Sequence, residues 1–322
     1  MAVVPVSIVV PTRNRRDSVL TLVRSLSRQS GVAVQLVVVV EGSTDGTLEA
    51  LADCGLPNLE VVYHPEPRGV SAARNAGLAR SEAEYVGFID DDDFWSPTRV
   101  SDAIEAMRSD AQGAAWSSCG VVGIDSRMNV TGFQPAPAAD TVVKDLYRGN
   151  AIPGGGSAVI ARTELIRAAG GFSPEFADLA DWDLWLRLIR LSPLATVPQY
   201  QIAYTFDALV PTHTRPARAI DELARLQTKH HFGAADLDAK SWNRWIYGQY
   251  WRAQDRRGMV GMSLREASRS HNPLHLGRAV AHRVLPMDAQ LIIAKARRRY
   301  MRRKFDPLAV RAAERWLADV RS

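Results

Sequence analysis

Four short apolar runs, each followed by a polar loop, constrain the fold of this chain more than any other feature of its sequence. The runs are rich in β-branched residues and span 6–11, 34–40, 59–63 and 85–90. Runs of this length and composition are typical of strands that are buried on both faces of a sheet. Helical patterns lie between them, so the sequence predicts an α/β fold with a mostly parallel sheet flanked by helices.

The helical patterns have apolar positions at i, i+3, i+4 and i+7. In the first of them these positions are Val19, Leu22, Val23 and Leu26. Asp17 precedes this pattern and is expected to cap the helix. Segment 69–81 is rich in small residues, which predicts a helix packed close to the sheet, and segment 182–191 repeats the helical spacing. Segment 120–133 is typical of a hairpin.

The charge of the chain changes sign along its length. Residues 1–214 hold 17 Lys/Arg and 25 Asp/Glu, a net charge of −8, whereas residues 215–322 hold 23 and 10, a net charge of +13. We therefore expect two regions, a sheet-containing domain over 1–214 and a basic, mainly helical extension over 215–322.

Composition excludes several classes of protein. The chain has two cysteines, Cys54 and Cys119, in no paired spacing, which argues against a disulfide framework or a thiolate metal site. No basic n-region precedes the first apolar run, and no stretch approaches the roughly 20 apolar residues that span a bilayer. A cytoplasmic protein is expected.

Polar loops follow the predicted strands at 11–15, 41–47, 64–75 and 90–95. In an open α/β sheet, ligands bind outside the carboxyl ends of the strands. The last loop holds four consecutive aspartates, Asp90 to Asp93, whose charges repel one another. An acidic run is more often a solvated loop, but three other polar loops at the same edge favour a ligand site here. A hard cation such as Mg²⁺ or Mn²⁺, shared with a diphosphate, would relieve the repulsion.

Five motifs occur in order over residues 5–213: SIVVPTRNR, VVVVEGSTDGT, RGVSAARNAG, FIDDDDFWSP and GGF…ADWDLWLRL. Together they resemble the family 2 glycosyltransferases with a GT-A fold. This resemblance implies an inverting transfer of sugar from a nucleoside-diphosphate sugar to an acceptor hydroxyl, in polysaccharide or glycoconjugate synthesis. It also implies Mn²⁺ or Mg²⁺ as cofactor.

The resemblance assigns roles to individual residues. Asp181 would be the general base, Asp92 the metal ligand, and His213 an additional metal or diphosphate ligand. The nucleotide-sugar would be bound by Pro11, Thr12, Arg13, Glu41, Arg68, Arg74, Asn75, Asp90 and Asp91.

Position alone makes Asp181 a helix cap, and Asp183 is the second candidate for the base. Trp182 and Trp185 could stack on an acceptor sugar, but their helical spacing favours core packing for at least one of them.

Two departures from the family pattern keep alternatives open. Val40 stands where the family usually has a first acidic residue, and Ala180 stands where it commonly has glutamate. A catalytically silent sugar-nucleotide-binding module is therefore one alternative. A nucleotidyltransferase is another, although segment 11–18 lacks the glycines of a phosphate loop.

A basic segment, 295–305, has seven Lys/Arg in eleven residues. Such clusters are attracted to anionic lipid by about 1 kcal/mol per charge. With a glycan or lipid-linked acceptor, this predicts contact with the inner face of a membrane. A nucleic-acid partner is the competing explanation; it fits an acidic catalytic half poorly and is not expected.

Overall fold

A computed structural model describes residues 4–205, 216–232, 238–270, 272–286, 289–290 and 305–321. Contacts divide the chain into two compact units. The first comprises Met1–Leu146, Asn150–Thr205 and Asp306–Ser322, and the second comprises Tyr147–Gly149 and Phe206–Phe305.

The first unit is built on a nine-stranded sheet, whose strand order is β3-β2-β1-β4-β8-β6-β9-β5, with β7 paired to β6. The strands are β1 (Val4–Thr12), β2 (Val32–Glu41), β3 (Leu59–His64), β4 (Tyr85–Phe88), β5 (Phe94–Trp95), β6 (Trp116–Ile124), β7 (Val130–Gln134), β8 (Ile160–Arg162) and β9 (Leu194–Thr205). The helices are α1 (Arg16–Leu26), α2 (Thr47–Ala52), α3 (Val70–Arg80), α4 (Arg99–Ser109), α5 (Val142–Arg148), α6 (Thr163–Ala168), α7 (Ala180–Leu191) and α13 (Pro307–Arg321), with a 3-10 turn at Gly155–Ala158.

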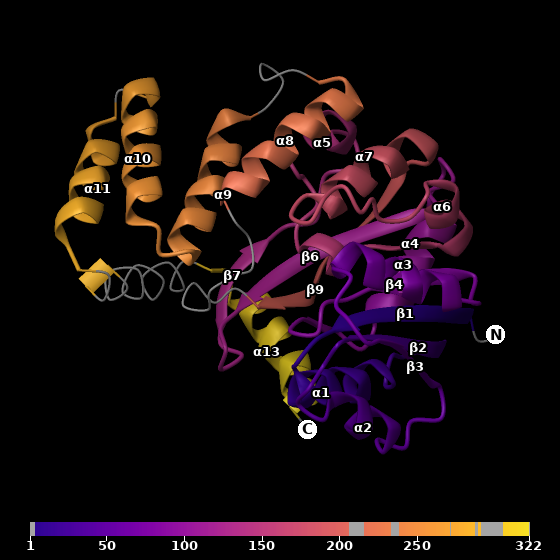
Figure 1. The fold of residues 1–322 in the computed structure, drawn as a ribbon. Helices are drawn as coiled ribbons and strands as arrows, with labels where there is room; N and C mark the ends of the chain where they lie inside the picture. The colour runs from indigo at the N-terminus through magenta and orange to yellow at the C-terminus, as the bar shows by residue number, and fades with distance from the viewer. Residues whose placement is uncertain are drawn as a thin grey trace. The chain divides into compact units, whose positions relative to one another are not determined.

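The four strands predicted from apolar runs form the parallel half of this sheet. β1 pairs in parallel with β2 and β4, and β2 pairs in parallel with β3. Helices α1 and α2 lie on one face of these strands and α3 lies on the other (Figure 1). The α/β class is confirmed. The sheet is mixed beyond β4, because β8 runs antiparallel to both of its neighbours, β4 and β6.

Two local predictions have different outcomes. The hairpin is confirmed, since β6 and β7 pair antiparallel across a turn. Helix α1 begins at Arg16, so Asp17 lies in its first turn and is not the cap. The reason is that Asp45, from the loop after β2, accepts the backbone N–H of Arg16 at 3.0 Å.

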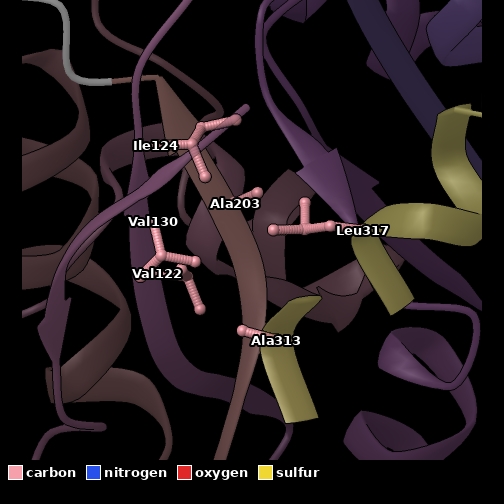
Figure 2. Packing of buried hydrophobic residues seen from close by; sticks show 6 residues of the cluster. All are labelled: Val122, Ile124, Val130, Ala203, Ala313 and Leu317. Carbon is pink, nitrogen blue, oxygen red and sulfur yellow. The ribbon is translucent and has the colours of Figure 1, made fainter. Parts of the chain in front are cut away.

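Helix α13 belongs to the first unit by its contacts, although the sequence prediction placed it in the C-terminal region. Its apolar face packs on the sheet around β6, β7 and β9 (Figure 2). The buried side chains of this cluster are Val122, Ile124, Val130, Ala203, Ala313 and Leu317. Burial of these side chains fixes α13 to the first unit.

The described part of the second unit is helical, as predicted for the region after residue 215. It contains α8 (Pro216–His230), α9 (Ala239–Arg252), α10 (Arg256–Ser270) and α11 (Pro273–Val284). Helix α10 packs against both α9 and α11. Across both units, none of the helices in the described ranges combines the length and the apolar character that crossing a bilayer requires.

Candidate active site

The loops that follow β1, β2, β3 and β4 are joined by hydrogen bonds at one edge of the sheet. Asn14 accepts the N–H of Thr44 through Oδ1 at 2.8 Å, which links the first two loops. Glu41 at the end of β2 accepts the N–H groups of Arg68 and Gly69, both at 2.8 Å. These contacts bring the predicted polar segments to one place, as the parallel register requires.

In the loop after β4, the repulsion between neighbouring aspartates is reduced by side chains of the protein that contact their carboxylates. Asp91 accepts the hydroxyl of Thr12 at 2.7 Å and Nη1 of Arg15 at 2.8 Å. Asp92 contacts the same Nη1 at 2.6 Å. Burial raises the pKa of Asp91 to about 6, against the opposing effects of Arg15 and Thr12. One guanidinium therefore contacts two neighbouring carboxylates and offsets part of their negative charge.

Asp90 has a separate cationic partner. Its Oδ1 lies 2.5 Å from Nη2 of Arg74, a buried side chain on α3 that also lies over the Phe172 ring, 5.0 Å from the ring centre. A Cβ at Gly156 would come 2.5 Å from Arg74 Nη2, so only glycine leaves room for the guanidinium. Nε of Arg74 is buried and has no hydrogen-bond partner among the described residues.

Asp93 turns into the protein interior. It is 1% exposed, accepts the hydroxyl of Ser157 at 2.6 Å, and accepts the N–H of Thr205 at 3.0 Å. Burial, and then the charges of Asp92 and Asp90, raise the pKa of Asp93 well above its ordinary value. This residue joins the acidic loop to the 3-10 turn and to the end of β9.

Asp181 lies in the first turn of α7, which begins at Ala180. Its carboxylate accepts the N–H of Trp182 at 2.8 Å and the side-chain amide of Asn150 at 3.2 Å. A Cβ at Gly155 would lie 3.2 Å from its Oδ2. Burial raises the pKa of Asp181, while the Trp182 N–H and the charge of Arg74 act in the opposite direction.

Asp183, the second candidate for the base, forms a buried ion pair with Arg187. Its side chain is fully buried, and its Oδ2 lies 2.6 Å from Nη2 of Arg187. Arg187 also donates to the carbonyls of Ala169 and Gly171. The Asp183 carboxylate is thus committed to an ion pair that holds the loop before α7.

Trp182 and Trp185 are both core residues, 1% and 0% exposed. Trp182 donates its indole N–H to the Leu146 carbonyl at 2.7 Å, and Trp185 stacks on Trp116 with ring centres 5.9 Å apart. The prediction that at least one packs in the core is confirmed, and the structure extends it to both.

The remaining predicted residues surround this edge. Arg13 and Arg68 are exposed, and Pro11 is half-buried beside buried Thr12. The Asn75 side chain is bonded to the backbone of Phe172: its amide N–H donates to the Phe172 carbonyl and its Oδ1 accepts the Phe172 N–H, both at 2.8 Å.

Glu41 is 6% exposed and its Oε1 lies 2.6 Å from Nδ1 of His64. The two departures, Val40 and Ala180, are both buried.

The carboxylates of this edge are few for a metal centre built by protein ligands alone. Within the described ranges, no three His, Cys, Asp or Glu side chains are grouped so that they could hold a metal ion. His213 lies outside the described residues. Mg²⁺ is usually held by one or two carboxylates with substrate phosphates. Asp91 and Asp92, which already share the cationic Arg15, offer such a partial site.

Sequence reasoning missed several side chains that shape the site. Arg15, Asn150 and Ser157 contact Asp91, Asp181 and the backbone N–H of Asp90, from 31 to 76 positions away in sequence. Arg15 lies in the polar loop 11–15 after the first strand, and its positive charge was the signal that could have indicated a carboxylate partner. The three consecutive glycines before Ser157 were the signal for the close approach of Arg74 and Asp181.

The strand order and the joined loops are those of a GT-A type transferase. TarS of S. aureus, residues 1–349, aligns with a TM-score of 0.57 over 86% of this chain and 80% of that chain, at 20% identity. The mannosyltransferase PcManGT of Pyrobaculum calidifontis, in complex with GDP-Man and Mn²⁺, aligns with a TM-score of 0.54 over 91% and 86%, at 19% identity. At these identities the likeness concerns the fold.

Residues 7–159 match the model of Glycosyl transferase family 2. The putative teichuronic acid biosynthesis glycosyltransferase TuaG of Bacillus subtilis is 35% identical over 104 residues, 32% of this chain and 41% of the relative. The succinoglycan biosynthesis protein ExoO of Rhizobium meliloti is 34% identical over 124 residues, 38% and 35% of the two chains. The chain thus matches less than half the length of these two relatives.

Proposed function

We propose that this protein is an inverting glycosyltransferase that moves a sugar from a nucleoside-diphosphate sugar to an acceptor hydroxyl in polysaccharide or glycoconjugate synthesis. One observation carries the proposal. Arg74 contacts Asp90 at 2.5 Å and acts electrostatically on Asp181, so a donor-side and an acceptor-side carboxylate share one buried cation. The match of residues 7–159 to the model of Glycosyl transferase family 2 supports the same reaction.

The donor would lie against the loops after β1, β3 and β4. Asp90 would bond the ribose, and Thr12 and Arg13 would line the nucleotide pocket, with Glu41 holding the adjacent loops in place. Arg68 is exposed at this edge and Arg74 has an unpartnered Nε, so both have donors to offer a diphosphate. TarS has been solved with UDP-GlcNAc, which makes this donor a first choice for experiment.

The acceptor would approach Asp181. Transfer breaks the bond between the anomeric carbon and the diphosphate oxygen and forms a bond from that carbon to the acceptor oxygen, through an oxocarbenium-like transition state. Asp181 would take the hydroxyl proton on a carboxylate oxygen. Each oxygen has a second lone pair beyond the bonds to Trp182 and Asn150. A direct displacement needs no second carboxylate as nucleophile.

The cofactor belongs to the proposal as Mn²⁺ or Mg²⁺. Asp92 would hold it, with Asp91 beside it and the remaining positions filled by diphosphate oxygens and water. When bound, the ion would stabilise the negative charge of the leaving diphosphate as a Lewis acid. The exposure of Asp92, 42% of its side chain, leaves its oxygens accessible from solution.

A panel of nucleoside-diphosphate sugars tests the proposal and its alternatives together. We expect release of the nucleoside diphosphate from one donor. An equal amount of sugar should be transferred to the acceptor or, by hydrolysis, released as free sugar. A nucleotidyltransferase would instead release pyrophosphate from a nucleoside triphosphate. Donor binding without release, over the whole panel and with Mn²⁺ present, would favour the silent binding module that Val40 and Ala180 left open.

The acceptor of such an enzyme can be lipid-linked. WfaP of Escherichia coli, 23% identical over 186 residues (57% of this chain and 70% of the relative), is a glucosyltransferase whose acceptor is a diphosphoundecaprenol-linked sugar. We propose that the basic C-terminal region contacts an anionic membrane surface. Residues 295–304 lie outside the described ranges. Helix α11, in the same region, exposes Leu276, Val280 and Val284 at helical spacing, with Arg283 beside them.

Sedimentation with anionic vesicles at low salt tests this contact. Because burial of an aliphatic side chain stabilises by about 1.5–3 kcal/mol, Leu276→Ser with Val280→Ser should weaken vesicle binding about tenfold or more. These two side chains are 53% and 55% exposed. Leu191→Ser with Val143→Ser is the matched control, at 56% and 52% in the first unit. Equal losses in the two double variants, or retention on DNA at the same salt, would contradict membrane contact through α11.

A further inference from the structure

Arg15 lies between two carboxylates of the acidic loop, one of which is the proposed metal ligand Asp92. One nitrogen, Nη1, lies 2.8 Å from Asp91 Oδ1 and 2.6 Å from Asp92 Oδ2. A single donor atom shared by two adjacent carboxylates offsets one of their two negative charges, where a divalent cation would offset both. Any ion that uses Asp92 Oδ2 must therefore compete with Arg15 for that oxygen.

The two arginine–aspartate pairs of this edge differ in how firmly they are held. The Arg74 side chain is 7% exposed and is enclosed by Phe172 and Gly156. The Arg15 and Asp92 side chains are 39% and 42% exposed. Exposed ion pairs contribute little net stability because water and salt screen them. The Arg15–Asp92 contact can therefore be exchanged at small cost, whereas Asp90, whose side chain is 34% exposed, is paired with an arginine that is buried and held in place.

We propose that Arg15 is an exchangeable counter-ion, which offsets part of the charge of Asp91 and Asp92 before the donor arrives and yields Asp92 to the divalent cation when the diphosphate binds. This inference rests on the proposed function, because it takes Asp92 as the metal ligand. A diphosphate supplies Arg15 with a replacement anion, and the guanidinium fork suits phosphate oxygens. The metal and the nucleotide should then bind cooperatively, with weak metal binding before the nucleotide.

Calorimetric titration with Mn²⁺ alone, without nucleotide, separates this role from simpler ones. Arg15→Gln removes the charge and keeps a side chain of similar reach, so Mn²⁺ should bind about tenfold tighter than in wild type, within the usual range of coupling between sites. A purely structural arginine predicts weaker Mn²⁺ binding in the variant. An arginine that contacts only phosphate predicts no change.

Two further variants make the result specific. Arg13→Gln removes the same charge from an exposed position of the same loop, and its effect on Mn²⁺ binding measures general electrostatic attraction. Asp92→Asn should remove Mn²⁺ binding in both the wild-type and the Arg15→Gln backgrounds. The proposal is overturned if Arg15→Gln binds Mn²⁺ no tighter than wild type, or if Arg13→Gln tightens binding equally.

A second titration measures the coupling itself. With UDP or GDP at saturation, wild type should gain Mn²⁺ affinity by a larger factor than Arg15→Gln, because the variant has no counter-ion to displace. Equal gains in the two proteins would overturn the exchange. The Mn²⁺-only titration involves no sugar transfer, so its outcome is independent of the donor panel. If the enzyme is active but Arg15→Gln binds Mn²⁺ as wild type does, the counter-ion role of Arg15 is refuted while the proposed function stands.

Discussion

Asp181→Asn is expected to lower the rate of sugar transfer by a factor on the order of 10²–10⁴, the usual contribution of a general base. Asparagine keeps the size of aspartate and an oxygen that can accept the N–H of Trp182, so α7 should persist. What it removes is the proton acceptor. Single-turnover measurements at saturating donor isolate this step from donor binding, which should stay near wild type because the donor loops follow other strands.

The pH dependence gives the same assignment a second test. Burial raises the pKa of Asp181, and a base must be ionised, so the wild-type rate should fall as pH drops through that raised pKa. For stability the sign is opposite: a raised folded pKa contributes stability at low pH that is lost as pH rises through it. Above that pKa the ionised carboxylate therefore destabilises the fold. Asp181→Asn should lose the acid limb of the rate profile and unfold at a higher temperature at pH 7.

Asp183→Asn is the matched control, since it makes the same change two positions along the same helical turn. It breaks the buried pair with Arg187, which should cost about 3 kcal/mol of unfolding free energy. Its chemical step per folded molecule should change little. A normal single-turnover rate in Asp181→Asn, or a slow one in well-folded Asp183→Asn, would move the base to Asp183.

Asp92→Asn is expected to reduce metal-dependent transfer by a factor on the order of 10³, because a Lewis-acid metal supplies several kcal/mol of charge stabilisation. The variant should also bind the nucleotide more weakly in Mn²⁺, but not in EDTA. Calorimetry under both conditions, with a turnover assay over a range of Mn²⁺ concentrations, provides the measurement.

Asp93→Asn is the comparison for this variant. Asp93 is buried with a strongly raised pKa, so a neutral amide of the same shape should replace it at small cost to activity. Nucleotide affinity in Mn²⁺ that is equal for wild type and Asp92→Asn would refute Asp92 as the metal ligand.

The parallel half of the fold was predictable because its strands carry long apolar runs. β1 and β2 have nine and ten residues, and strands of that length bury enough β-branched side chains to be recognised from sequence. β5 and β8 have two and three residues, too few to show any periodicity. Their pairing depends on contacts such as that between the Trp95 indole and the Ser157 carbonyl, which no local pattern encodes.

The candidate site was likewise predictable only in part: its aspartates could be placed from sequence motifs, but their partners could not. The motifs placed Asp90, Asp92 and Asp181 at strand ends and at a helix start, because loop order along a parallel sheet determines which segments meet. Their partners Arg15, Asn150 and Ser157 could not be found this way. Each reaches its aspartate through tertiary packing, and a single arginine or serine in a loop has no distinguishing spacing.

The packing of α13 on the sheet has a consequence for how the chain matures during synthesis. The strands of the first unit are translated well before residues 307–321, so the apolar surface of Val122, Val130 and Ala203 waits uncovered while about a hundred residues of the second unit are made. Exposed apolar surface of this kind attracts chaperones and other nascent chains. This part of the sheet can therefore be covered only after residues 307–321 have been made, although its strands are made much earlier.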